Sequence, residues 1–97
     1  MRQLIFRAAA SADLRGIARY TRARWGDEQA AEYVSNLRHQ IKSLRAFPLR
    51  FPEFEGGQTG LRQMIAGRHM VFYVVSAERI EIVRVLHEAM DFGEWLG

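Results

Sequence analysis

Three short apolar runs, separated by tight turns, fill most of the last third of the chain and limit what it can fold into. They span residues 61–65, 70–75 and 80–86, and the loops between them have only four residues each. Loops of this length join neighbouring antiparallel strands as hairpins. The sequence therefore predicts an antiparallel β-meander in this part of the chain.

Two features of these runs predict how the sheet is covered. Residues 70–75 are apolar on both faces, which indicates a central strand with helices on one face and either the C-terminal tail or a partner on the other. In residues 80–86 the alternation changes phase after Ile82. Either both faces are buried there, or a β-bulge lies near Ile82 and Val83.

The residues before the meander predict a short strand and two helices. Residues 4–8 alternate as in a strand, and apolar residues then recur at helical spacing up to Gly26. We expect Ser11 to cap the first helix, Asp27 to cap the second, and Phe47-Pro48 to end it. So short a link between the helices implies an antiparallel helical hairpin packed on the sheet, an α+β fold.

Length and composition are those of one globular domain spanning residues 1–97. Apolar residues make up 48% of the chain and charged residues 26%. There is no cysteine, and the three histidines lack metal-ligand spacing, so we expect no metal and no cofactor. The N-terminal apolar run is too short for a signal peptide or a membrane span, and a cytoplasmic location is expected.

The charge is distributed unevenly along the chain. Residues 1–50 carry ten Lys or Arg against four Asp or Glu, whereas residues 51–97 carry four against seven. The cations of the two expected helices recur at i, i+4 and i+7, namely Arg15, Arg19 and Arg22 on the first and Arg38, Lys42 and Arg45 on the second. Such basic stripes are either a docking surface for an anionic partner or a solvated outer face.

Only one pair of side chains offers a catalytic interpretation. Arg62 begins one expected strand and His87 ends another. If they converged with Glu53 or Glu55, His87 could act as general acid or base and Arg62 could stabilise a developing charge during RNA cleavage. The alternative is structural: His87 bonds the backbone at its strand end, and Arg62 pairs with a nearby Glu.

The aromatic residues of the first two thirds are expected to pack rather than to form a base-stacking platform. Trp25 and Tyr33 lie at helical spacing, while Phe47, Phe51 and Phe54 lie beside prolines in a loop that their rings pin down. The tail carries Phe92, Trp95 and Leu96, which are expensive to leave in water, so it is expected to dock.

The order and residues of these segments resemble the ParE branch of the RelE/ParE toxin superfamily, the toxin halves of bacterial toxin–antitoxin modules. The resemblance covers nearly the whole chain. It rests on Ser11-Ala-Asp-Leu with Ile17 and Tyr20, the hinge from Arg24 to Tyr33, Gly60-Leu-Arg62, the strand Val71 to Val75, and the run Ile80 to His87.

The resemblance implies a protein that inhibits DNA gyrase, blocks replication and is neutralised by a ParD-like ribbon-helix-helix antitoxin, which alone would contact operator DNA. It implies no catalytic residue. The sister RelE branch, which cleaves mRNA on the ribosome, is the alternative and would use Arg62 and His87. A third possibility is a family member that only binds its antitoxin.

The resemblance and the charge pattern together suggest binding residues. We expect antitoxin contacts at the basic stripes and nearby aromatic residues: Arg15, Arg19, Arg22, Trp25, Arg38, Phe47, Phe51 and Phe54. We expect gyrase contacts in the C-terminal tail: Met90, Phe92 and Trp95.

Overall fold

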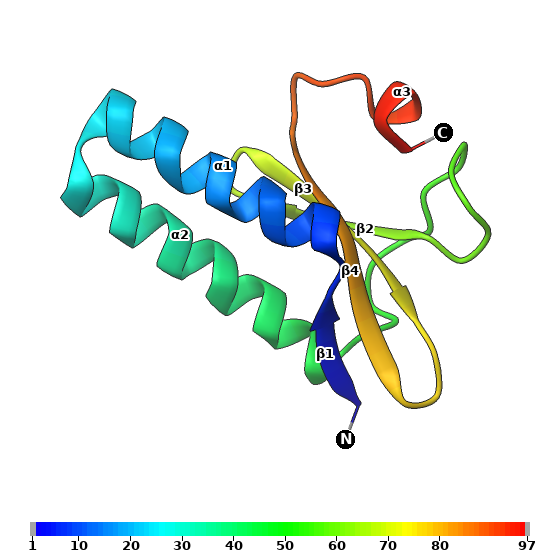
Figure 1. The fold of residues 1–97 in the computed structure, drawn as a ribbon. Helices are drawn as coiled ribbons and strands as arrows, with labels where there is room; N and C mark the ends of the chain where they lie inside the picture. Colours follow the sequence, from blue (N-terminus) through cyan, green and yellow to red (C-terminus); the bar gives the residue numbers. More distant parts are fainter. Residues whose placement is uncertain (1, 97) are drawn as a thin grey trace.

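A computed structural model describes residues 2–96 of the chain (Figure 1). It has an N-terminal strand, a helical hairpin, three further strands and a short C-terminal helix. In chain order these are β1 (Gln3–Phe6), α1 (Ala8–Trp25), α2 (Asp27–Lys42), the 3-10 turn η1 (Ser43–Arg45), β2 (Arg62–Ala66), β3 (His69–Val75), β4 (Arg79–His87) and α3 (Phe92–Leu96).

The four strands form one sheet in the order β1-β4-β3-β2. The three C-terminal strands are antiparallel neighbours, as the hairpin loops predicted. β1 pairs with β4 in parallel, with Leu4 opposite Ile80 and Phe6 opposite Ile82. The sheet is therefore mixed, and the helical hairpin together with β2 and β3 forms the long connection between the two parallel strands.

Helix α1 begins earlier than the sequence pattern indicated. Its N-cap is Arg7, which makes no side-chain capping bond, and the predicted cap Ser11 lies inside the helix with its N–H donating to the Arg7 carbonyl. Three alanines at positions 8–10 have the best helix propensity of any residue and extend the helix backwards. The expectation that Ser11 caps the helix was wrong.

Helix α2 is displaced from its predicted bounds at both ends. Gly26, with φ +92°, is the N-cap, and Asp27 is the first helical residue. The α-helix ends at Lys42, and the chain continues as a 3-10 turn over residues 43–45 before Phe47. The basic stripe of this helix is therefore shorter than predicted, because Arg45 lies in the turn.

Each face of the sheet has its own core. The face toward the helices buries Leu14, Leu37 and Ile41 against Val71 and Tyr73. On the other face, Phe72 and Leu86 are buried with Leu61 beneath the tail and the loop before β2. Figure 1 shows the α1–α2 hairpin along one side of the sheet and α3 near that loop on the other. The tail is thus the second cover predicted for the central strand.

The predicted β-bulge is present. Phe72 lies opposite Arg84, but its neighbour Tyr73 lies opposite Ile82, so Val83 has no partner on β3. The extra residue restores an alternation in which Ile82 and Val85 both face the helices.

The loop between η1 and β2 is held to the sheet by backbone and side-chain bonds. The Tyr73 hydroxyl donates to the Pro48 carbonyl at 2.8 Å, and Arg62 Nη1 donates to the Phe51 carbonyl at 2.6 Å. Burial raises the pKa of Tyr73, which keeps its proton available for this bond. Among the described helices, none has both the length and the apolarity needed to cross a membrane.

Candidate functional site

Asp13 connects helix α1 to the middle of the sheet. β1 covers the edge of β4 only as far as Ile82, and α1 lies along the rest. There Asp13 Oδ2 accepts the Val85 N–H at 2.9 Å and Arg84 Nε at 2.8 Å, while Oδ1 accepts Arg84 Nη2 at 2.8 Å. The carboxylate thus satisfies a strand edge and a guanidinium together, and the hydrogen bond to it raises the pKa of Arg84.

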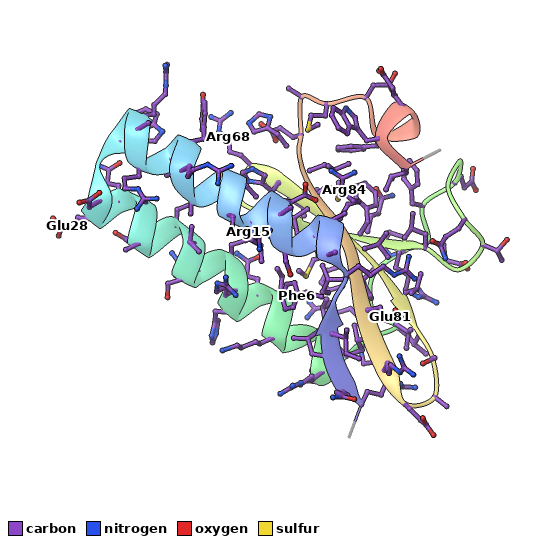
Figure 2. All side chains as sticks on the ribbon, in the orientation of Figure 1. Phe6, Arg15, Glu28, Arg68, Glu81 and Arg84 are labelled. Atoms are coloured by element: carbon purple, nitrogen blue, oxygen red, sulfur yellow. The ribbon has the colours of Figure 1, made fainter. Side chains whose placement is uncertain are left out.

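Arg84 also contacts the tail. Its guanidinium lies 5.6 Å from the centre of the Trp95 ring, a cation–π distance. Arg84 therefore lies between a carboxylate of α1 and an indole of α3, and Figure 2 shows it between these two elements. Helix α1, strand β4 and the tail therefore meet at this one side chain.

A cluster of Tyr33, His69 and His87 lies where β3 begins and β4 ends. The Arg68 N–H donates to the Tyr33 hydroxyl oxygen at 3.0 Å, and that hydroxyl is 2.6 Å from His69 Nδ1. Since the oxygen accepts from Arg68, its own proton is assigned to His69, which is then neutral with Nδ1 as acceptor. Burial, and next the nearby His87, lower the pKa of His69 to about 4.

His87 makes the backbone contact that its structural interpretation predicted. Its Nδ1 accepts the Ala89 N–H at 3.1 Å, and its ring packs edge-on to His69 with centroids 5.3 Å apart. Both histidines thus have their Nδ1 atoms occupied by hydrogen bonds.

These side chains border a large groove, which we call the aromatic groove. It has a volume of about 1090 Å³ and is bounded by α1, the start of α2, the ends of β3 and β4, and the tail. Its exposed apolar residues include Tyr20, Trp25 and Trp95, which are 64%, 59% and 51% exposed, and Met90 lies beside them. Aromatic surface this open is typical of a protein-binding site.

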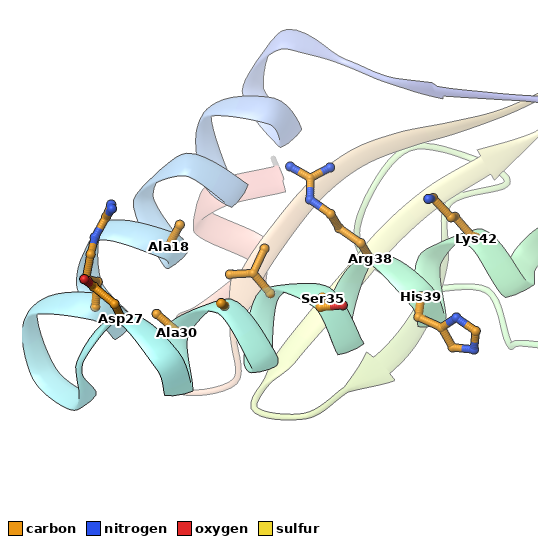
Figure 3. A pocket seen from close by; sticks show the side chains of 10 residues that line it. Ala18, Asp27, Ala30, Ser35, Arg38, His39 and Lys42 are labelled. Carbon is orange, nitrogen blue, oxygen red and sulfur yellow. The ribbon is translucent and has the colours of Figure 1, made fainter.

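A second, smaller groove runs between α1 and α2 and has a volume of about 560 Å³. Figure 3 shows Arg38 and Lys42 extending from α2 in one direction, with Ala18 and Ala30 in the floor between the helices. We call this groove, together with the adjoining arginine stripe of α1, the basic face. It comprises Arg15, Arg19, Arg22, Arg38 and Lys42, all exposed.

The two candidate catalytic side chains lie at opposite ends of the sheet. Arg62 is opposite Tyr73 of β3, whereas His87 is opposite His69, which lies four residues before Tyr73 on the same strand. At 3.3 Å per residue this separates them by about 13 Å along the strand. Arg62 donates to the carbonyls of Phe51 and Leu49 instead of pairing with a Glu side chain. Within residues 2–96, no three His, Cys, Asp or Glu side chains are grouped to hold a metal.

The residues expected to bind the antitoxin lie on separate surfaces. The four arginines Arg15, Arg19, Arg22 and Arg38 lie on the basic face, and Trp25 lines the aromatic groove. Phe47 is exposed, while Phe51 and Phe54 are half-buried and pack on the two cores. The rings of Phe51 and Phe54 thus anchor the loop.

The residues expected to bind gyrase also lie in two different environments. Met90 and Trp95 line the aromatic groove together with Trp25. Phe92 points inward, with its ring 5.0 Å from Phe72 and 6.3 Å from Phe54. One groove therefore contains residues expected to bind each of the two partners.

The sequence analysis predicted no contact for Asp13, Tyr20 or His69. The pairing of His69 with His87 depends on the bulge: counting back from the turn without it places His69 opposite Leu86. A signal was present, because the phase change after Ile82 marked the extra residue.

Comparison with known proteins identifies the family. The model of the family described as "ParE toxin of type II toxin-antitoxin system, parDE" matches residues 4–92. Toxin ParE1 of Caulobacter vibrioides is 41% identical over 88 residues, 91% of each chain. Toxin ParE of Escherichia coli is 39% identical over 92 residues, which cover 94% of this chain and 89% of that one.

Solved structures share the fold. A chromosomal ParDE toxin–antitoxin system from P. aeruginosa contains a chain with a TM-score of 0.79 and 22% identity, covering 90% of this chain and 96% of that one. The E. coli DinJ-YafQ complex contains one with a TM-score of 0.62 and 14% identity, covering 92% and 96%. These likenesses confirm a RelE/ParE-like α+β fold. The chain belongs to the ParE toxin family of type II toxin–antitoxin systems, as the order of its sequence motifs predicted.

Proposed function

We propose that this toxin acts in the cytoplasm by binding and inhibiting DNA gyrase, so that replication stops, and that a ParD-like antitoxin neutralises it. The observation that carries the proposal is the separation of Arg62 from His87, since a mechanism based on binding needs no convergent catalytic pair. Family membership supports it, because the related proteins are named as ParE toxins.

Neutralisation follows from competition for the aromatic groove. Trp25, Met90 and Trp95 line it together, and they include residues expected to contact the antitoxin and residues expected to contact gyrase. A helix with an apolar face can insert anchors between such side chains. An antitoxin helix seated there would cover Met90 and Trp95 and exclude gyrase.

The decisive experiment titrates purified, antitoxin-free toxin into a gyrase supercoiling and DNA-cleavage assay. We expect supercoiling to fall and cleaved DNA to accumulate, and antitoxin added beforehand to prevent both. A folded toxin with no effect on gyrase would overturn the proposal.

Two variants sharpen the assay. His87→Gln should keep its inhibitory effect, because a binding mechanism needs no proton transfer at position 87; loss of growth inhibition in a stably folded His87→Gln variant would favour mRNA cleavage instead. Trp25→Ala should weaken binding to both antitoxin and gyrase. Leu49→Ala is its control, because Leu49 is similarly exposed at 58% but lies in the loop before β2.

A further inference from the structure

We propose that the basic face of the helical hairpin binds the phosphate backbone of duplex DNA directly. This goes beyond the sequence-based expectation that the toxin contacts DNA only through its antitoxin. The face presents two parallel rows of cations on neighbouring helices. Three observations favour a polyanion as its ligand: the spacing of the cations, the absence of ion pairs to them within residues 2–96, and the small side chains on the floor of the groove.

The cations are placed to act together. Arg15, Arg19 and Arg22 recur at i, i+4 and i+7 on one side of α1, which spans about 10 Å along the helix axis. Arg22 lines the same groove as Arg38 and Lys42 of α2. Duplex DNA carries one negative charge per about 1.7 Å of its axis, so several phosphates fall within reach of such a surface.

None of these charges is paired with a carboxylate in the part of the chain that the structure describes. The ion pairs among residues 2–96 involve Arg7, Arg68 and Arg84, and no cation of the basic face has a carboxylate within 4.0 Å or donates a side-chain hydrogen bond there. Asp27 is the one acidic residue lining the groove. Five neighbouring unpaired cations repel one another and gain free energy when an anion neutralises them.

The floor of the groove argues against an apolar helix as its occupant. It consists of Ala18, Ala30, Ala31 and Val34, which offer little apolar area to anchor side chains. Large apolar side chains are concentrated in the aromatic groove on the other side of α1. Four of the five cations are arginines, whose planar guanidinium groups bind phosphate oxygens in pairs.

The inference deepens the proposed function, because DNA bound by gyrase would lie against one face of the toxin while gyrase occupies the aromatic groove. The binding step itself needs neither gyrase nor antitoxin. It can therefore fail while gyrase inhibition holds, and the two failures are distinguishable.

The test measures fluorescence anisotropy of a labelled 20-base-pair duplex titrated with antitoxin-free toxin at several salt concentrations. We compare wild type with Arg22→Gln/Arg38→Gln. Each phosphate contact contributes about 0.9 to the slope of log affinity against log salt, so the double variant should reduce that slope by about 1.8. Between 50 and 200 mM salt, wild type should then lose about twelvefold more affinity than the variant.

The matched control is Arg24→Gln/Arg79→Gln, which removes the same charge from two exposed arginines outside the face. Arg24 borders the aromatic groove, and Arg79 begins β4. Circular dichroism and thermal melts establish that all variants fold. Equal salt slopes for the two double variants would overturn the proposal, as would the absence of DNA binding by wild type. If Arg22→Gln/Arg38→Gln lost antitoxin affinity while binding DNA normally, the face would be a protein-docking surface instead.

Discussion

At the scale of single residues, Asp13 accepts more hydrogen bonds than any other charged side chain in the described part of the chain. Its two oxygens accept three hydrogen bonds from Arg84 and Val85, and the Arg84 and Asp13 side chains are only 20% and 14% exposed. Low exposure limits screening by solvent and salt, so this pair contributes more than a surface ion pair does.

The Asp13→Asn variant should lower the free energy of unfolding by about 1.5–3 kcal/mol, because hydrogen bonds to a charged partner are replaced and Arg84 is left unneutralised. Urea denaturation measures the loss. Glu81→Gln is the control: the Arg7–Glu81 contact is 3.4 Å long and 39% and 30% exposed, and should be worth less than about 1 kcal/mol. Equal losses for both variants would contradict the central role of Asp13.

His69 predicts a dependence of stability on pH. Its pKa is lowered from 6.5 to about 4 in the folded protein, chiefly by burial. Above pH 6.5 it is neutral in both states and has no effect. Below pH 6.5 the unfolded chain binds a proton that folded His69 does not, so the free energy of unfolding falls until about pH 4.

The stability difference between wild type and His69→Gln should therefore shrink as the pH is lowered from 7 to 4.5, in chemical denaturation at each pH. NMR titration of the His69 ring gives its pKa directly. A constant difference across this range, or a titration near 6.5, would show that His69 is not held neutral by its surroundings.

At the scale of secondary-structure elements, the β2–β3 turn depends on contact with α2. Gly67 has φ +59°, and a Cβ built there would lie 2.8 Å from the Tyr33 hydroxyl. This oxygen also accepts the Arg68 N–H and contacts His69, so it has little freedom to move. The turn and the Tyr33–His69 cluster therefore require a residue without a side chain at position 67.

Gly67→Ala should destabilise the protein by about 1–3 kcal/mol, through backbone strain and displacement of Tyr33. Gly16→Ala is the matched change: Gly16 lies inside α1 with no atom within 4 Å of the added Cβ, and should stabilise the protein by about 0.5–1 kcal/mol. Thermal melts of the two variants should thus move in opposite directions; shifts of the same sign would refute this explanation.

The tail is held by a core of its own. Phe92 packs between Phe72 and Phe54, while Trp95 contributes mainly its contact with Arg84. Phe92→Ala should cost about 2 kcal/mol, less than for a fully buried Phe, and should expose the 89–96 backbone to hydrogen exchange. Trp95→Ala should leave that backbone protected. Exchange that is fast in both variants would mean that Trp95, too, holds the tail.

The elements themselves were largely predictable, because periodicity reports which faces are buried. The bulge at Val83 and the covered outer face of β3 were both visible in the alternation of apolar residues. Helix ends were less predictable: Ser11 has the chemistry of a cap, but alanines 8–10 continue the helix past it. The parallel β1–β4 pairing was not predicted, since four residues carry no signal of strand direction.

At the scale of the whole molecule, the grooves could not be located from the sequence. The aromatic groove joins Trp25, Met90 and Trp95 across some seventy residues, and only the packing of α1 and the tail against β4 brings them together. The basic face was more predictable, because the spacing of Arg15, Arg19 and Arg22 places them on one side of any helix.

The sequence-based expectation that acidic antitoxin residues also contact the arginines of α1 can be tested separately from DNA binding. If acidic antitoxin residues contact the α1 arginines, affinity should fall with rising salt, and Arg19→Glu should weaken binding by about tenfold or more. Titration calorimetry at two salt concentrations measures both effects. Arg79→Glu, the same charge reversal at the start of β4, is the control. If the dissociation constant is unchanged both by salt and by Arg19→Glu, the arginines of α1 are not part of the antitoxin interface.

The parallel pairing of β1 with β4 also governs when the toxin becomes active during synthesis. Residues 3–6 leave the ribosome first, but their partners, residues 79–82, are made more than seventy residues later. The hydrogen bonds between Asp13 and Arg84 likewise cannot form until residue 84 has been synthesised. The nascent chain can form its helical hairpin early, yet neither the sheet nor the aromatic groove exists until β4 emerges. Under the proposed function, we therefore expect the chain to be unable to bind a partner in the aromatic groove for most of its synthesis, so that an antitoxin is needed only at the end.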